Sequence, residues 1–326
     1  MIPLRTPATP YYSSHPMSDP RVRLVLNPQA GSGAARRKLP EIVRAFQKWG
    51  VAYEVAGTSG PGDASRIARA SFDDGIDVIA VAGGDGTLNE VSQAYLSDDG
   101  TPRSGPDLAI IPIGTGGDFK RTLGLSGSIE QAVERLSQAK PRAIDLGVLE
   151  LDDHTGARAV RAFVNITSFG MGGVTDKLVN EAPKFMGGKA AFFIGTTRAM
   201  FAYRNAPVRV AVDGKEFVNG PIFNVAVANG RFFGGGMMIA PEADPSDGLF
   251  EVVALGDLSR TAALSLSTKI YKGLHIGTQK VSATRGKVIE AESSGTTPVL
   301  IDMDGETPGR LPLRIRVAEG LLRVRA

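Results

Sequence analysis

The feature that most constrains the fold is a regular alternation of short β-rich segments and helical segments from Arg21 to about residue 147. Strands are expected at 21–26, 51–55, 77–82 and 108–113, which are runs of mostly aliphatic residues. Helices are expected between them because apolar residues recur at helical spacing, as at Leu39, Ile42, Val43 and Phe46. This alternation favours an α/β domain, with a parallel sheet covered by helices on both faces.

The pattern changes after residue 147 to apolar or alternating runs with few helices between them, which favours a largely antiparallel, sandwich-like second domain. The runs are 163–166, 208–212, 222–228, 249–255, 299–301 and 313–317, and the helical stretches are 174–203 and 260–277. We therefore expect an α/β domain over 21–147 and a β-rich domain over 148–317, with 318–326 able to return to the first domain. Residues 1–20 are expected to form a disordered tail, with Met17 as an alternative start.

Composition excludes several classes of site. The chain of 326 residues has no cysteine, which rules out disulfide scaffolds, thiolate nucleophiles and iron–sulfur clusters. Its three histidines are scattered, so any metal should be a hard cation with oxygen ligands. The net charge of +3 does not call for nucleic acid. No apolar run reaches membrane-spanning length and the start lacks a signal-peptide core, so the cytoplasm is the simplest location.

Three glycine-rich loops follow strands of the first domain: 27–33 (NPQAGSG), 83–87 (GGDGT) and 114–118 (GTGGD). Glycine lets backbone N–H groups converge on an anion, and the N-terminus of the next helix adds positive potential. Each loop alone is also typical of an ordinary βα turn, but three together predict a polyphosphate site. None is a P-loop, and the dinucleotide fingerprint G-x-G-x-x-G with a spaced acidic residue is absent from the sequence.

The loop 83–87 resembles the GGDGT signature of diacylglycerol kinases, sphingosine kinases, bacterial YegS-like lipid kinases and, more distantly, NAD kinases. The resemblance extends to 112–119 (PIGTGGDF), to 228–249, and to the late triplet 304–306 (DGE), and it keeps their order and spacing. It implies a Rossmann-like first domain, of the kind in NAD kinases and phosphofructokinases, with a β-sandwich second domain.

This resemblance also implies an activity: ATP-dependent phosphorylation of a lipid hydroxyl, with diacylglycerol as the default substrate and phosphatidic acid as its product. The implied cofactors are ATP and Mg²⁺. The partner would be a lipid at a membrane surface, with transient contact at the inner face of the membrane and no nucleic acid. A homodimer is compatible with the resemblance.

The family's nucleotide site is carried over to residues of the first domain. These are Asn27, Pro28, Gly31, Ser32, Thr58, Gly83, Gly84, Asp85, Gly86, Thr87, Asn89, Gly114 and Thr115. One position departs from the family pattern, because Gly117 stands where an asparagine is usual. The departure removes an amide side chain near the nucleotide and shifts the expected contact there to the backbone.

By the same resemblance, Asp304 is the expected catalytic base. Glu306 lies two residues further on and shares a face with Asp304 if the segment is extended, so it would polarise Asp304 or raise its pKa. Without the other motifs, a D-G-E triplet would be interpreted as a β-turn.

The resemblance implies two magnesium sites. Asp85, Asp118 and Asp145 each lie next to a predicted strand end and would reach the ion through water. For Asp118 a helix N-cap, and for Asp145 a structural hydrogen bond, are the alternatives. In the second domain, Asp247 with the carbonyls of Asp244 and Leu249 would form a separate site, although an acidic turn ending in glycine is equally typical of a surface loop.

Two segments could meet the lipid. The stretch 185–203 is rich in phenylalanine and is interrupted by Lys184, Lys189 and Arg198 around its apolar residues, and Lys269, Lys272 and Lys280 form a weaker basic set. A core helix with a charged edge is the alternative for the first segment. Two other functions stay open: an NAD kinase-like enzyme, and a non-catalytic protein that binds nucleotide or lipid on the same fold.

Overall fold

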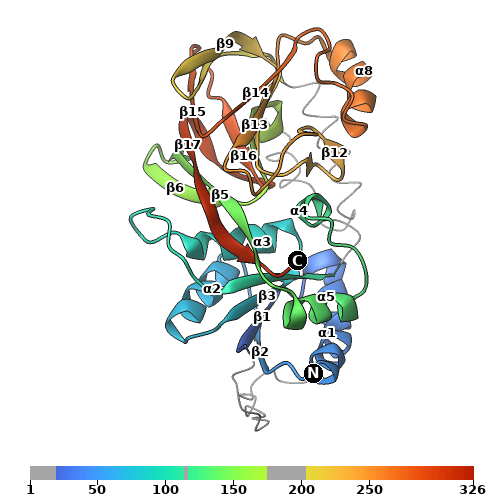
Figure 1. Ribbon diagram of the computed structural model, residues 1–326. Helices are drawn as coiled ribbons and strands as arrows, with labels where there is room; N and C mark the ends of the chain where they lie inside the picture. Colours follow the sequence, from blue (N-terminus) through green and yellow to red (C-terminus); the bar gives the residue numbers. More distant parts are fainter. Residues whose placement is uncertain (1–19, 114–116, 175–202) are drawn as a thin grey trace.

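The computed structural model describes residues 20–113, 117–174 and 203–326. Figure 1 shows two lobes stacked along the long direction of the molecule, with the first domain at the bottom and the second at the top. Their strands join in one continuous sheet of 15 strands, in the order β14-β13-β10-β7-β16-β17-β4-β3-β1-β2 along its main path. Within the described ranges, no helix is both long and apolar enough to cross a bilayer.

The first domain is built on four parallel strands, as expected from the alternation. They are β1 (Val22–Leu26), β2 (Tyr53–Gly57), β3 (Val78–Gly83) and β4 (Asp107–Pro112), in the spatial order β2-β1-β3-β4. Val22 of β1 pairs with Tyr53 on one side and with Val78 on the other. The three neighbouring strands therefore end at one edge, where ligands of parallel sheets bind.

Helices cover both faces of this sheet because side chains alternate along each strand. Leu24 and Ala80 face α1 (Ala30–Lys48) and α5 (Ile129–Gln138), whereas Val25 and Ile79 face α2 (Asp63–Asp73) and α3 (Asp85–Ser92) with the short 3₁₀ helix η1 (Gln93–Tyr95). The helix α5 begins with a capping box: the Ser128 side chain accepts a hydrogen bond from the Gln131 N–H, and the Gln131 side chain accepts one from the Ser128 N–H.

The second domain consists mainly of antiparallel strands, as the change of pattern predicts. Its elements are β5 (Arg142–Asp153), β6 (Arg158–Phe163), β7 (Ile166–Gly170), β8 (Ala206–Val212), β9 (Lys215–Ile222), β10 (Asn224–Ala228), β11 (Phe232–Phe233), β12 (Met237–Met238), β13 (Phe250–Leu255), α8 (Arg260–Tyr271), β14 (Val281–Gly286), β15 (Val288–Ser293) and β16 (Leu300–Met303). Its core includes the stacked rings of Phe163 and Phe250, with centroids 5.6 Å apart. The short helix α4 (Asp118–Thr122) of the first domain packs beside β11.

Element boundaries differ from the sequence-based expectation most clearly at one strand and one helix. The expected strand 163–166 spans the break between β6, which ends at Phe163, and β7, which begins at Ile166. The expected helix 260–277 ends at Tyr271 because Gly273 adopts a left-handed φ of 67°. Nearly all of the other helical stretch, 174–203, and with it the phenylalanine-rich segment and its basic residues, lies outside the described residues.

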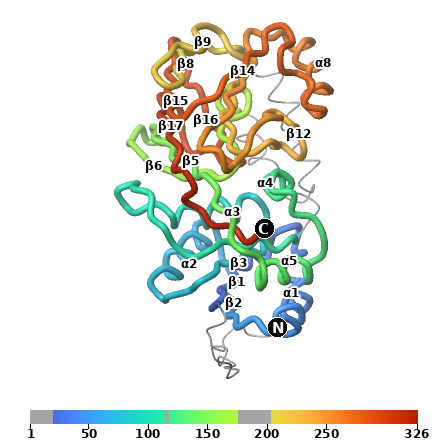
Figure 2. The backbone as a smooth tube through the Cα atoms, in the orientation of Figure 1, coloured from blue at the N-terminus to red at the C-terminus, as the bar shows by residue number. Residues whose placement is uncertain are grey.

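The last strand, β17 (Glu306–Val324), runs through both domains. It pairs antiparallel with β5 along most of its length, and Val324 at its end pairs in parallel with Leu108 of β4. Leu322 and Val324 are buried in the core of the first domain. Figure 2 shows this red segment descending from the upper lobe to the C-terminus in the lower lobe.

Candidate active site

A cavity of about 250 Å³ lies at the carboxyl ends of the parallel strands β3 and β4. It is lined by Ala30, Gly31, Val81, Gly83, Gly84, Asp85, Leu88, Ile110, Pro112, Ile113, Gly117 and Lys120. All three glycine-rich loops thus contribute to one cavity, and four residues of the predicted nucleotide set line it: Gly31, Gly83, Gly84 and Asp85.

The first loop adopts a backbone conformation that ordinary residues avoid. Gly31, Ser32 and Gly33 have φ values of 60°, 55° and 81°, all in the left-handed region. A left-handed serine costs on the order of 1–3 kcal/mol and persists only where its surroundings hold it. The loop is tied to the second one by Asn27, whose Nδ2 donates to Thr87 Oγ1 at 3.1 Å. These two loops therefore form one cradle.

The second loop requires glycine at its first position. A Cβ on Gly83 would lie 2.4 Å from Thr87 Oγ1, so only glycine lets Thr87 pack under the loop. Asp85 begins α3, and its Oδ2 accepts a 3.0 Å hydrogen bond from the N–H of Asp118. That bond joins the second loop to the third.

The third loop is described only in part, since Gly114 and Thr115 lie outside the described residues. Gly117 has φ 114° and precedes α4, and Lys120 on that helix lines the cavity. Sequence reasoning missed Lys120, although a cation one turn after a glycine-rich loop is suited to phosphate.

Other members of the predicted nucleotide set lie around the cavity without lining it. The N–H of Thr58, just after β2, donates to the carbonyl of Leu26, and Pro28 lies between β1 and α1. Asn89 on α3 directs its side chain to the DGE triplet: its Nδ2 donates to Asp304 Oδ2 at 3.1 Å.

Asp304 is the centre of a hydrogen-bond cluster that joins the two domains. Its Oδ2 accepts from Asn89 Nδ2 and from the Val164 N–H, and its Oδ1 accepts from the N–H groups of Asn165 and Ile166, at 2.9–3.2 Å. A carboxylate offers about four acceptor positions, so these four donors fill them. Burial raises the pKa of Asp304 to about 6, against the lowering effect of the hydrogen bonds. A proton can join this carboxylate only if one of the donors is displaced.

Glu306 differs from Asp304 in its surroundings. A Cβ on Gly86 would lie 4.0 Å from Glu306 Oε1, which places this carboxylate against the second loop. Its side chain accepts no hydrogen bond from the described residues. Partial burial raises the pKa of Glu306, and the nearby carboxylates of Glu90 and Asp302 raise it further. Glu306 therefore offers unused lone pairs beside the second glycine-rich loop.

Of the three aspartates predicted to reach magnesium, the structure brings two together. Asp118 is joined to Asp85, and its own carboxylate accepts from the Gly235 N–H at 2.8 Å and pairs with Arg121 at 2.9 Å. Burial raises the pKa of Asp118, and the negative charge of Asp85 raises it further.

Asp145 is engaged elsewhere. Its two carboxylate oxygens accept from the N–H groups of Gly248, at 2.8 Å, and Gly320, at 2.7 Å. The structural hydrogen-bonding alternative thus describes Asp145, and the expected convergence of three carboxylates reduces to the pair Asp85 and Asp118. Burial raises the pKa of Asp145 too.

The pair Asp85 and Asp118 fits a magnesium ion that arrives with a nucleotide. In the part of the chain that the structure describes, no group of three or more carboxylate or histidine side chains could hold a metal by itself. Mg²⁺ commonly uses one or two carboxylates together with substrate phosphates. Asp85 lines the cavity, and its negative charge repels that of Asp118. A cation bound between these carboxylates and a phosphate would relieve the repulsion.

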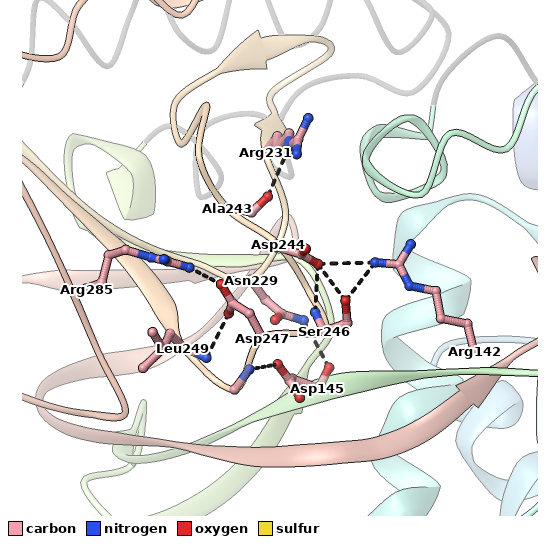
Figure 3. Close-up of polar contacts among 11 residues, drawn as sticks. Arg142, Asp145, Asn229, Arg231, Ala243, Asp244, Ser246, Asp247, Leu249 and Arg285 are labelled. Atoms are coloured by element: carbon pink, nitrogen blue, oxygen red, sulfur yellow. Dashed lines mark hydrogen bonds and ion pairs between the residues drawn. The ribbon is translucent and has the colours of Figure 1, made fainter.

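At the second predicted metal site, both acidic side chains are engaged by arginines (Figure 3). Asp244 accepts from the N–H and hydroxyl of Ser246, at 3.0 and 2.7 Å, and pairs with Arg142 at 3.1 Å. Asp247 accepts from the Leu249 N–H and forms an ion pair with Arg285. The Asp244 carbonyl, one of the expected ligands, accepts from the Asp247 N–H. Two guanidinium groups therefore neutralise the carboxylates of this turn.

Further contacts bridge the domains next to the cavity, and sequence reasoning missed them because their partners are distant in the chain. Gln93 exchanges two hydrogen bonds with the backbone of Ala162, at 2.7 and 2.9 Å. Thr122 Oγ1 accepts from the Arg231 N–H at 2.9 Å. The acidic triplet is thereby held against the phosphate loops by contacts on both sides.

Comparisons with known proteins agree with this geometry. Residues 21–149 match the diacylglycerol kinase catalytic domain, and residues 165–326 match the YegS C-terminal NAD kinase beta sandwich-like domain. A probable lipid kinase YegS-like of Stenotrophomonas maltophilia is 31% identical over 94% of this chain and 96% of its own length. A diacylglycerol kinase of Mycobacterium tuberculosis is 30% identical over 93% of this chain and 94% of its own.

Solved structures share the fold. The crystal structure of a putative diacylglycerol kinase from Bacillus anthracis has a TM-score of 0.74 at 24% identity, covering 94% of this chain and 98% of its own. Yeast NADH kinase has a TM-score of 0.51 at 11% identity, covering 98% and 89% of the two chains. From its two matched domains and its full-length relatives, the chain belongs to the diacylglycerol kinase and YegS-like family of lipid kinases.

Proposed function

We propose that this lipid kinase transfers the γ-phosphate of ATP to the hydroxyl of diacylglycerol, which gives phosphatidic acid. The observation that carries the proposal is the position of Glu306, whose carboxylate faces Gly86 of the glycine-rich cradle. A hydroxyl between Glu306 and the cradle would lie next to both a proton acceptor and the terminal phosphate. The names of several full-length relatives support diacylglycerol as the acceptor.

The cavity supplies the groups that a triphosphate needs. Backbone N–H groups of the glycine-rich loops would bind phosphate oxygens, and Lys120 would add a positive charge. Asp85 and Asp118 would hold the magnesium ion that accompanies ATP. That ion, when bound, neutralises part of the charge on the phosphates.

The two carboxylates of the triplet would divide the remaining work. The lipid hydroxyl oxygen bonds to the γ-phosphorus, the bond from that phosphorus to the oxygen of ADP breaks, and ADP leaves. The hydroxyl proton passes to Glu306, because its lone pairs are unused. Asp304 positions the triplet against α3 and the β6–β7 break through its four hydrogen bonds. This assignment moves the base from Asp304, as the resemblance implied, to Glu306.

Diacylglycerol resides in a bilayer, so the reaction would take place at a membrane surface. We place the enzyme in the cytoplasm with transient contact at the inner face of the membrane, and nucleic acid has no part in the reaction.

The test is transfer of labelled γ-phosphate from ATP and Mg²⁺ to a panel of acceptors in mixed micelles. The panel contains diacylglycerol, monoacylglycerol, sphingosine, ceramide and phosphatidylglycerol, with NAD as the acceptor for the NAD kinase alternative. We expect labelled phosphatidic acid, and we expect Glu306→Gln to lower kcat by about 100-fold or more, as loss of a general base does, while ATP binding measured by calorimetry is kept.

Preferential labelling of another lipid would replace the substrate, and labelling of NAD alone would replace the reaction. If ATP binds but no acceptor is labelled, the non-catalytic alternative gains support. Near-normal kcat in Glu306→Gln together with its loss in Asp304→Asn would return the base to Asp304.

A further inference from the structure

The surface of the second domain carries a concentration of exposed apolar side chains. Among the described residues, five large hydrophobic side chains are strongly exposed, and four of them lie between residues 264 and 276. These are Leu264, Tyr271, Leu274 and Ile276, with 62%, 52%, 65% and 36% of their surface exposed. The fifth, Val55, lies in β2 of the first domain. We call residues 264–276 the α8 surface.

The helix α8 buries one face and exposes the opposite one. Ala263, Leu266 and Ile270 pack into the core of the second domain. Leu264 and Tyr271 are seven positions apart, which is close to two helical turns, so they share the outer face. Figure 1 shows α8 on the outer edge of the upper lobe. The exposed pair therefore points away from the protein.

The segment after α8 continues this surface because one residue fixes it from inside. His275 is fully buried, and its Nε2 is 2.9 Å from the carbonyl oxygen of Ile239. Its neighbours in the chain, Leu274 and Ile276, are both exposed. The buried imidazole thus anchors a turn that presents two more aliphatic side chains to solvent.

The charged residues of the chain segment that carries this surface have one sign. No aspartate or glutamate occurs between Leu258 and Ile289. Lys269 and Lys272 at the end of α8 are exposed and form no ion pair with the described residues. Aliphatic side chains mixed with uncompensated lysines, with a tyrosine among them, are the composition of interfacial helices that bind anionic lipid.

We propose that the α8 surface docks this enzyme on an anionic lipid bilayer. A bilayer is favoured over a protein partner or a second copy because the enzyme phosphorylates lipids, and because the lysines complement a negative surface. This inference rests on the proposed function insofar as the acceptor is a bilayer lipid. The apolar side chains would enter the headgroup region while Lys269 and Lys272 remain with the phosphates.

The test is sedimentation of the full chain, without nucleotide, with vesicles of phosphatidylcholine alone or mixed with phosphatidylglycerol. We expect binding to the mixed vesicles. The double variant Leu264→Ser with Leu274→Ser and the double variant Lys269→Gln with Lys272→Gln should each weaken it by about tenfold. The matched controls are Val55→Ser, the exposed apolar residue outside the α8 surface, and Lys215→Gln, an exposed lysine on β9.

A second measurement keeps the proposal testable if a serine variant folds poorly. Tyr271→Trp adds an indole to the α8 surface, and brominated lipid in the mixed vesicles should quench it. The native Trp49 lies at the end of α1 in the first domain, so the unmodified chain gives the background signal.

Phosphorylation of a short-chain diacylglycerol in micelles separates this inference from the proposed function. The α8 variants should keep that activity. If diacylglycerol is not phosphorylated at all, the proposed function fails, but vesicle binding can still be measured. Three results would overturn the inference: equal binding by wild type and both double variants, absence of quenching in Tyr271→Trp, or a dimer in solution that Leu264→Ser with Leu274→Ser dissociates.

Discussion

The side-chain amide of Asn89 donates a 3.1 Å hydrogen bond to Asp304, although the two residues are 215 positions apart in the chain. Asn89 belongs to the helix that starts in the second phosphate loop, and Asp304 belongs to the turn that carries Glu306. The bond therefore links the second glycine-rich loop to the turn that carries the proposed proton acceptor. It makes Asp304 important for both stability and activity.

Replacement of Asp304 should affect both properties. Asp304→Asn keeps the shape but points an NH₂ group at N–H donors, so we expect the free energy of unfolding to fall by about 1–3 kcal/mol, as when buried donors lose their acceptor. Activity should fall with it. Glu306→Gln should change the free energy of unfolding by less than about 0.5 kcal/mol, because its carboxylate accepts no such bonds. Urea unfolding of both variants checks this, and equal stabilities would contradict the division of roles.

The second loop offers a matched pair of glycines. A Cβ at position 83 would meet Thr87 Oγ1 at 2.4 Å, whereas a Cβ at position 84 meets nothing within 4 Å. We expect Gly83→Ala to lower the melting temperature by several degrees, since about 1–3 kcal/mol of strain is typical of overpacking. Gly84→Ala should melt like the wild type yet bind ATP more weakly, because Gly84 lines the cavity.

Thermal melting and calorimetric titration of ATP test both parts of this expectation. A lowered melting temperature in Gly84→Ala as well would mean that the loop is sensitive to any side chain, and the steric explanation for Gly83 would fail.

Arg285 should make the acidic turn of the second domain independent of magnesium. In Arg285→Ala, Asp247 loses its ion pair while Asp145 remains close enough to feel its charge. We expect a loss of about 1 kcal/mol, and added Mg²⁺ should stabilise this variant more than the wild type. Arg314→Ala removes a more exposed pair with Glu290 and serves as the control. Melting curves without nucleotide, with EDTA or Mg²⁺, provide the measurement. A wild type whose stability needs Mg²⁺ would restore the metal site.

The activity should fall on the acid side of about pH 6. The pKa of Asp304 is raised to about 6, so this carboxylate takes up a proton as the pH drops toward that value. The pKa of Glu306 is also raised, by partial burial and by the nearby carboxylates of Glu90 and Asp302, so Glu306 takes up a proton at a higher pH than an ordinary glutamate does. Protonated Glu306 is too weak a base to accept the hydroxyl proton, and protonation of Asp304 displaces one of its hydrogen-bond donors. A profile of kcat against pH tests this, and a flat profile from pH 8 to about pH 5 would contradict it.

Asp304 should make the folding stability depend on pH in the opposite direction to the activity. A carboxyl group whose pKa is higher in the folded state binds protons more tightly there, so its contribution favours folding at low pH. That contribution is lost as the pH rises from about 4 to about 6. Asp304→Asn should remove this pH dependence from urea unfolding curves, and an unchanged dependence would assign it to other groups.

Much of the fold follows from local patterns in the sequence. The alternation that predicted the parallel sheet depends on residues such as Leu24 and Ile79, which fill a core at a fixed period. The capping box of Ser128 and Gln131 needs only a spacing of three. The glycine-rich loops were visible because a phosphate cradle needs glycine at strand ends.

The chemistry of the site depended on contacts between distant segments, which no local pattern reveals. The triplet 304–306 was predicted to carry the catalytic base, but three of the four donors to the Asp304 carboxylate are N–H groups of residues 164–166, more than 130 positions earlier. Arg285 and Asp247 are 38 positions apart, so the sequence of the acidic turn gave no sign of this ion pair. The sequence could not reveal the partners of Asp145, because the donors are the backbone N–H groups of Gly248 and Gly320.

The strand β17 has a consequence for how the chain is made. Leu322 and Val324 complete the core of the first domain, but the ribosome synthesises them after the whole second domain. The first domain therefore cannot complete its core during translation ahead of the rest, as an independent N-terminal domain would. The edge of β4 that pairs with residue 324 therefore stays open until the end of the chain has been made.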